Sequence, residues 1–117
     1  MPRFWSWLLL GLALTPAPTL AHAVLMASQP ATGGSVPAGT VAIVLRFNSR
    51  IDRDRSRLKL VTPDHREVVL PLAGEDAPDT LHSASALEPG KYVLSWQVLA
   101  TDGHLTRGDV PFTVTGP

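Results

Sequence analysis

The chain has 117 residues, with 10 Lys and Arg against 10 Asp and Glu, and no cysteine. This length allows one domain, and the balanced charge argues against a nucleic-acid-binding protein, which needs a basic face. Without cysteine there is no disulfide framework, thiolate zinc site, iron–sulfur cluster or thiol nucleophile. Any metal must therefore be held by His, carboxylate, Met or backbone groups.

The first residues have the features of a secretory signal peptide. Arg3 gives a positive start, a leucine-rich stretch covers residues 8–14, and small residues at positions 19 and 21 suit a signal peptidase. The apolar stretch is too short to span a bilayer comfortably. We therefore expect residues 1–21 to be removed on export to a periplasm of the Gram-negative type.

The position of the cut decides the mature N-terminus. Cleavage after Ala21 leaves residues 22–117, which is 96 residues with a net charge of −1, and makes His22 the first residue. Residues 21–23 also form an A-x-A triplet, so cleavage after Ala23 is an open alternative that would discard the histidine. No later segment approaches 18 consecutive apolar residues, so we expect a soluble mature domain. We also expect it to be a monomer.

Short strands dominate this mature chain. Apolar and polar side chains alternate in the two longest segments, as in strands that bury one face. Residues 52–57 would form one helical turn at most. Pro, Gly and Asp-Gly turn signals separate the strands. About seven short strands in about 100 residues predict an all-β protein, an antiparallel β-sandwich. In chain order, the predicted strands cover residues 24–27, 41–47, 58–62, 68–72, 80–83, 92–99 and 110–114.

His22 is notable because, as the first residue, it would offer two metal donors. Its free α-amine and imidazole Nδ1 can bind one ion in a six-membered chelate ring, and a metal readily displaces their protons near neutrality. The alternative interpretation is a flexible end residue, left where the export machinery happened to cut.

A second candidate is the segment from Asp102 to His104. Residues i and i+2 of an extended segment point the same way, so Asp102 and His104 could offer a carboxylate oxygen and an imidazole nitrogen to one point. Asp-Gly is also the commonest hairpin signal, so the alternative is an exposed turn with no ligand.

Together, the amine, both imidazoles and the carboxylate form an N₃O set. Four such donors in a plane suit Cu(II), so we predict one Cu(II) ion bound by His22, Asp102 and His104. Met26 is the one methionine left after cleavage, so no Met-rich Cu(I) site is expected. We predict that Trp96 lies in the core, and that His65 and His82 are solvated.

Four motifs are spread along the mature chain. They are His22-Ala23-x-Leu25-x-x-Ser28-x-Pro30-Ala31-x-Gly33, Leu45-x-Phe47, Leu87-x-x-Gly90-x-Tyr92-x-Leu94-x-Trp96 and Asp102-Gly103-His104-x-x-x-Gly108. Through them the chain resembles the CopC family of periplasmic copper-resistance proteins along essentially its whole mature length. The resemblance implies a Greek-key β-sandwich that is cupredoxin-like in outline, and Cu(II) ligation by His22, Asp102 and His104.

Three departures from the family pattern follow. Residues 60–72 contain no Met, which indicates a Cu(II)-only member. Asn48 and Ser49 follow Phe47, where the family often has an acidic residue near the copper. Leu105 stands where a Pro often follows the second histidine.

The resemblance implies a non-catalytic protein that buffers, carries or delivers copper for homeostasis or resistance. Its candidate partners are a CopD-type inner-membrane copper transport protein or another periplasmic copper protein. Two alternatives remain open from the residues. One is a copper oxygenase with an N-terminal histidine brace, which the closed ligand set around Asp102 disfavours. The other is a metal-free Ig-like structural module.

Overall fold

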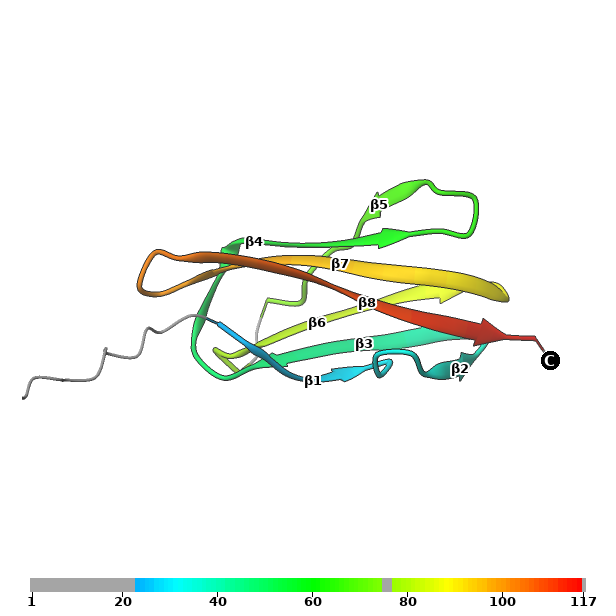
Figure 1. The fold of residues 1–117 in the computed structure, drawn as a ribbon, viewed down its shortest axis with the longest axis horizontal. Helices are drawn as coiled ribbons and strands as arrows, with labels where there is room; N and C mark the ends of the chain where they lie inside the picture. The colour runs from blue at the N-terminus through cyan, green and yellow to red at the C-terminus, as the bar shows by residue number, and fades with distance from the viewer. Residues whose placement is uncertain (1–22, 75–76, 117) are drawn as a thin grey trace, which may run out of the picture.

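The computed structural model describes residues 23–74 and 77–116. All of the regular structure in these residues is strand, which confirms the predicted all-β class. Figure 1 shows the strands running side by side along the long axis of the molecule. The strands are β1 (Leu25–Gln29), β2 (Ser35–Pro37), β3 (Gly39–Phe47), β4 (Ile51–Val61), β5 (Glu67–Val69), β6 (Thr80–Leu87), β7 (Gly90–Ala100) and β8 (Leu105–Thr115).

The strands form two sheets that pack face to face as a sandwich (Figure 1). One sheet has three strands in the order β1-β3-β6, and the other has five in the order β2-β8-β7-β4-β5. Strands that follow one another in the sequence repeatedly change sheet, as in a Greek-key sandwich. The start of β1 and the turn between β7 and β8 consequently lie at the same end of the molecule (Figure 1).

The core between the sheets is formed by every second side chain of the long strands. Alternate side chains of β3, from Val41 to Phe47, are at most 4% exposed, and β7 buries every second residue from Tyr92 to Ala100. Burial of such apolar area is the main stabilising contribution to a fold that has no disulfide. Trp96 is 7% exposed, and its ring meets that of Phe47 edge-on at 5.1 Å between centroids. The prediction of a core Trp is therefore confirmed.

Two details differ from the sequence prediction. The strand β2 lies in what was expected to be a loop, and it pairs in parallel with the end of β8. A segment of three residues that includes Pro37 is too short to show alternation of apolar and polar side chains. Its extended form therefore depends on pairing with β8.

The expected helical turn at residues 52–57 is also replaced by strand. The register between β4 and β7 shifts here, from Asp52 opposite Leu99 to Arg57 opposite Gln97, so β4 accommodates extra residues as a bulge. The hydroxyl of Ser56 bonds to the Asp52 carbonyl at 2.7 Å and accepts from the Leu99 N–H at 3.3 Å. The side chain thus replaces ladder bonds that the bulge removes.

Candidate metal centre at the β7–β8 turn

Residues 101–104 form the tight turn that joins β7 to β8. The Gly103 N–H donates to the Ala100 carbonyl and the Ala100 N–H donates to the His104 carbonyl, each at 2.9 Å. Gly103 has a φ of 91°, in the left-handed region that a residue without Cβ adopts at little cost. The Asp-Gly hairpin signal is therefore confirmed, and the same turn presents both predicted ligands.

Within this turn, the Asp102 carboxylate holds His104 through two contacts. Its Oδ1 accepts from the His104 backbone N–H at 3.0 Å, and its Oδ2 lies 2.9 Å from the imidazole Nδ1. The side chains are 26% and 53% exposed, so both reach the surface at the end of the sandwich. The two side chains therefore lie side by side, held by a tight turn rather than by the extended segment that the i, i+2 spacing predicted.

The N-terminal segment passes close to this turn. Ala23 is 2% exposed, and its carbonyl oxygen accepts a hydrogen bond of 3.2 Å from the hydroxyl of Thr106, two residues after His104. The next residue, Val24, donates its N–H to Asn48 Oδ1 at 2.8 Å, and its carbonyl accepts from the Asn48 N–H at 3.0 Å. His22 itself lies outside the described residues.

The other two histidines are separate from the turn. His65 is in the turn between β4 and β5 with a φ of 67°, and His82 is on β6 opposite Val44. In the part of the chain that the structure describes, no three His, Cys, Asp or Glu residues come together as a metal site. Asp102 and His104 therefore need at least one ligand from elsewhere to complete one.

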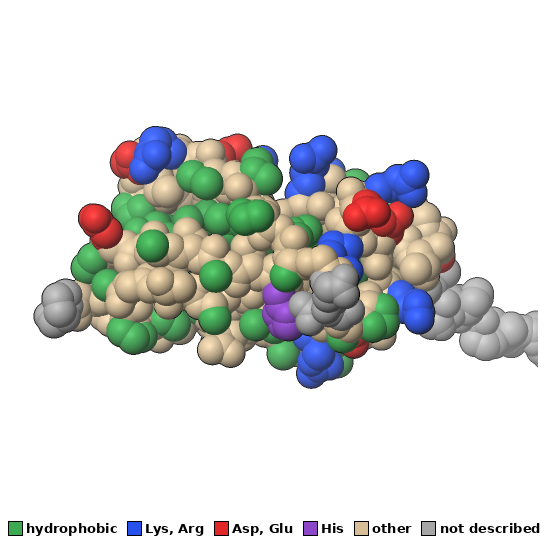
Figure 2. Space-filling model, turned by 180° about the vertical axis from the view of Figure 1, so that it is seen from behind, with side chains coloured by type: hydrophobic (Ala, Val, Ile, Leu, Met, Phe, Trp, Pro, Cys, Tyr) green, Lys and Arg blue, Asp and Glu red, His purple; other side chains and the backbone are tan. Residues whose placement is uncertain are grey.

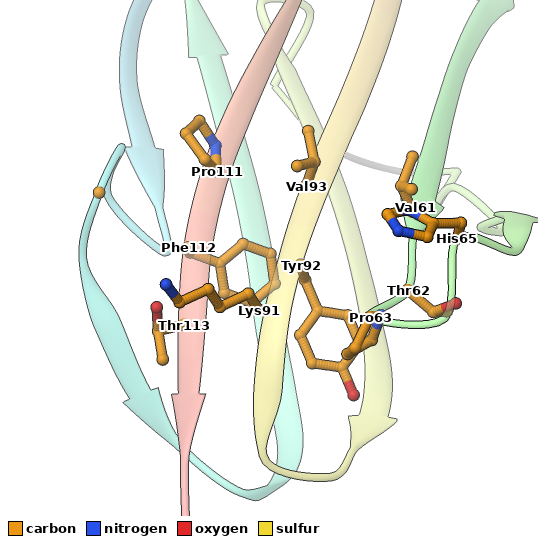
Figure 3. A pocket seen from close by; sticks show the side chains of 11 residues that line it. Val61, Thr62, Pro63, His65, Lys91, Tyr92, Val93, Pro111, Phe112 and Thr113 are labelled. Carbon is orange, nitrogen blue, oxygen red and sulfur yellow. The ribbon is translucent and has the colours of Figure 1, made fainter.

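A shallow pocket of about 600 Å³ lies on the outer face of the five-stranded sheet, toward the opposite end of β7 and β8 (Figure 3). Val61, Val93 and Pro111 form an apolar row across three strands, because they are register partners. Figure 3 shows three titratable side chains beside this row, which are those of His65, Lys91 and Tyr92. No sequence motif marks this row, because its residues are the outward-facing members of their strands.

On the face shown in Figure 2, Lys and Arg side chains gather mostly toward one end of the molecule, and Asp and Glu side chains lie beside basic ones at both ends. Among the described residues, no helix is long and apolar enough to cross a membrane.

Comparison with known proteins places the chain in a family. The CopC domain model matches residues 25–115, which include Asp102 and His104. Protein YobA of Escherichia coli K12 is 32% identical over 98 residues, covering 80% of this chain and 79% of YobA. The copper transport protein CutJ of Bacillus subtilis is 22% identical over an alignment of 129 positions, which covers 96% of this chain and 21% of CutJ.

Two solved structures have the same fold. CopC from Methylosinus trichosporium OB3b superposes with a TM-score of 0.75 at 30% identity, covering 81% of this chain and 95% of that one. PcoC, a methionine-rich copper resistance protein from Escherichia coli, gives a TM-score of 0.70 at 25% identity, covering 81% of this chain and all of that one. The chain therefore belongs to the CopC family of copper-binding resistance proteins, which are not enzymes.

Proposed function

We propose that this protein binds one Cu(II) ion through the α-amine and imidazole of His22 together with Asp102 and His104. The observation that carries the proposal is the hydrogen bond from Thr106 to Ala23. It ties the residue that follows His22 to β8, two positions after His104. Consecutive Cα atoms are 3.8 Å apart, so a ligand at position 22 has only a short distance to reach the turn.

The donor set favours oxidised copper over other ions. Two imidazoles, an amine and a carboxylate provide N₃O coordination, which suits the tetragonal preference of Cu(II) at the top of the Irving–Williams order. Asp102 Oδ2 and His104 Nδ1 lie 2.9 Å apart, so the carboxylate oxygen and this ring nitrogen are close enough to bind one ion side by side. With Asp102 filling the fourth position, the centre holds copper rather than activating oxygen.

The burial of Ala23 supports cleavage after Ala21 rather than after Ala23. A cut after Ala23 would remove a side chain that is 2% exposed and a carbonyl bonded to Thr106. A cut after Ala21 keeps both and creates the free amine of His22. We infer that residues 1–21 direct export to the periplasm and that residues 22–117 are the working domain. Mass spectrometry of the exported protein tests this, because a first residue of Val24 would overturn it.

The cellular role that fits this site is copper homeostasis or resistance, with the domain acting as a monomeric carrier. The relatives named for copper resistance and copper transport support this role. A CopD-type inner-membrane protein or another periplasmic copper protein would exchange copper with it. Exchange suits a site at the exposed end of the sandwich, where the Asp102 and His104 side chains reach the surface.

Copper titration of purified protein beginning at His22 tests the ligand set. We expect one equivalent of Cu(II), with the EPR spectrum of a tetragonal N,O site. The His22→Ala variant, or a glycine added before His22, should weaken binding by orders of magnitude because each removes part of the chelate. The matched control is His65→Asn, in a turn far from Asp102, which should bind copper like the unchanged protein. Tight binding by His22→Ala would overturn the ligand set, and no binding by the unchanged domain would favour a metal-free module.

A further inference from the structure

The loop that follows β3 contacts the N-terminal segment through two paired hydrogen bonds. Asn48 Oδ1 accepts from the Val24 N–H at 2.8 Å, and the Asn48 N–H donates to the Val24 carbonyl at 3.0 Å. One bond is between backbones, and the other needs the amide side chain. Asn48 is exposed, so this contact contributes no packing of the hydrophobic core.

The side chain of Asn48 replaces a ladder bond that the backbone no longer provides. The pairing of β1 with β3 ends at Leu25 opposite Phe47, and one position further the Val24 N–H donates to the Asn48 side chain at 2.8 Å instead of to a backbone carbonyl. The register between β1 and β3 is also irregular at Leu25. Past the end of this pairing, Asn48 holds Val24 against the three-stranded sheet.

The two contacts converge on the segment next to the proposed ligand from opposite sheets. Asn48 follows β3 of the three-stranded sheet, and Thr106 lies on β8 of the five-stranded sheet. Val24 and Ala23 are the two residues after His22, and each is bonded to one of them. A segment fixed before the metal arrives loses less conformational freedom on binding, which increases affinity.

We propose that Asn48 is a positioning residue for copper binding, which acts by fixing Val24 and through it the location of His22. This inference rests on the proposed function. Asn48 would not touch the metal. It would raise affinity by preparing the N-terminal segment, a different role from that of the acidic residue expected near this position in the family pattern.

Cu(II) affinity, measured by competition with a chelator of known affinity, tests the inference. Asn48→Ala should bind copper about tenfold more weakly, a change of about 1.4 kcal/mol. Asn48→Asp keeps an oxygen acceptor for the Val24 N–H and should restore most of the affinity. The matched control is Ser83→Ala, which removes a side-chain bond of 2.6 Å to the Pro71 carbonyl elsewhere in the same sheet. It should leave copper affinity unchanged.

A double-mutant cycle with His22→Ala separates positioning from a general structural effect. If Asn48 acts through residue 22, Asn48→Ala should lower affinity clearly more in the unchanged protein than in the His22→Ala protein, which keeps only the amine of the chelate. An equal loss in both backgrounds would overturn the inference, as would no loss in the unchanged protein. In both cases the loss caused by His22→Ala alone would leave the proposed function standing. If His22→Ala binds copper normally, the proposed function fails, and the positioning role fails with it.

Discussion

The hydroxyl of Thr106 donates a hydrogen bond of 3.2 Å to the carbonyl oxygen of Ala23, across 83 positions of the sequence. It joins the segment before β1 to the second residue of β8, at the end of the sandwich where Asp102 contacts His104. Because this end lacks a disulfide, such polar contacts fix the position of the N-terminal segment here.

Thr106→Val should lower both stability and copper affinity. Valine has nearly the same shape as threonine but no hydroxyl to donate a hydrogen bond. The half-buried Ala23 carbonyl therefore loses its partner, which lowers the free energy of unfolding by about 1 kcal/mol. For a domain of this size that corresponds to a fall in Tm of about 4–8 °C in thermal denaturation. Thr106→Ser, which keeps the hydroxyl, is the control and should retain most of the Tm. A Tm for Thr106→Val equal to that of the unchanged protein would contradict the role of this bond.

Gly108→Ala should destabilise the core around Trp96. A Cβ at position 108 would lie 2.6 Å from Trp96 Cζ2 and 2.9 Å from Cε2, so the indole must move. Overpacking of this kind costs about 1–3 kcal/mol. Trp96 is the one Trp of residues 22–117, so its fluorescence spectrum would report the displacement directly.

The control for this substitution is Gly74→Ala, because nothing lies within 4 Å of a Cβ at that position. It should change neither the fluorescence spectrum nor the Tm appreciably. An unchanged spectrum in Gly108→Ala would show that the Gly in this motif does not serve to accommodate the indole.

Arg53→Met should loosen the connection between β5 and β6. The guanidinium donates to the carbonyls of Gly74, Ala77 and Thr80 at 3.2, 3.1 and 3.3 Å, so one side chain from the β4 bulge satisfies three backbone acceptors. Loss of charged hydrogen bonds of this kind costs about 1.5–3 kcal/mol in chemical denaturation.

Arg55→Met is the matched control, since Arg55 is 73% exposed and pairs only with Asp52 among the contacts described. Exposed ion pairs contribute about 0–1 kcal/mol. Equal effects of the two substitutions would contradict the particular role of Arg53.

The turn between β4 and β5 contains an acid-sensitive contact. Hydrogen bonds from the Thr62 hydroxyl and from Arg66 hold the pKa of the Asp64 carboxyl below its usual value. A carboxyl with a lowered pKa in the folded state stabilises the protein above its unfolded pKa of about 3.9 and loses that effect as pH falls through the folded value. Asp64→Asn should therefore lower the Tm slightly at neutral pH, and the difference should vanish in strong acid. A difference that persists there would contradict this origin.

Copper should be released as the solution is acidified. Protons compete with the metal for imidazole and amine nitrogens, so affinity falls as pH falls. The EPR signal of the bound ion should give way to that of aqueous Cu(II) between neutrality and about pH 4. Copper that stays bound well below pH 4 would show that ligands other than these hold it.

Much of the fold was predictable because its signals are local. Alternation of apolar residues identified β3 and β7, since a strand with one buried face repeats every two residues. The closeness of Asp102 and His104 was predicted from their spacing, but it arises from the tight turn that the Asp-Gly pair forms and not from an extended segment. The bulge in β4 and the strand β2 were not predictable, because each depends on the register of a partner strand far away in the sequence.

The sequence by itself determined the all-β class, the cysteine-free donor set and the local pairing of Asp102 with His104. The joint role of these two residues with His22 remains a prediction. Only the tertiary structure decided that Ala23 is buried, that Thr106 and Asn48 hold the segment after His22, and that Gly108 accommodates Trp96. The physical reason is that these contacts join residues on different strands, and only the packed sheets bring those strands together.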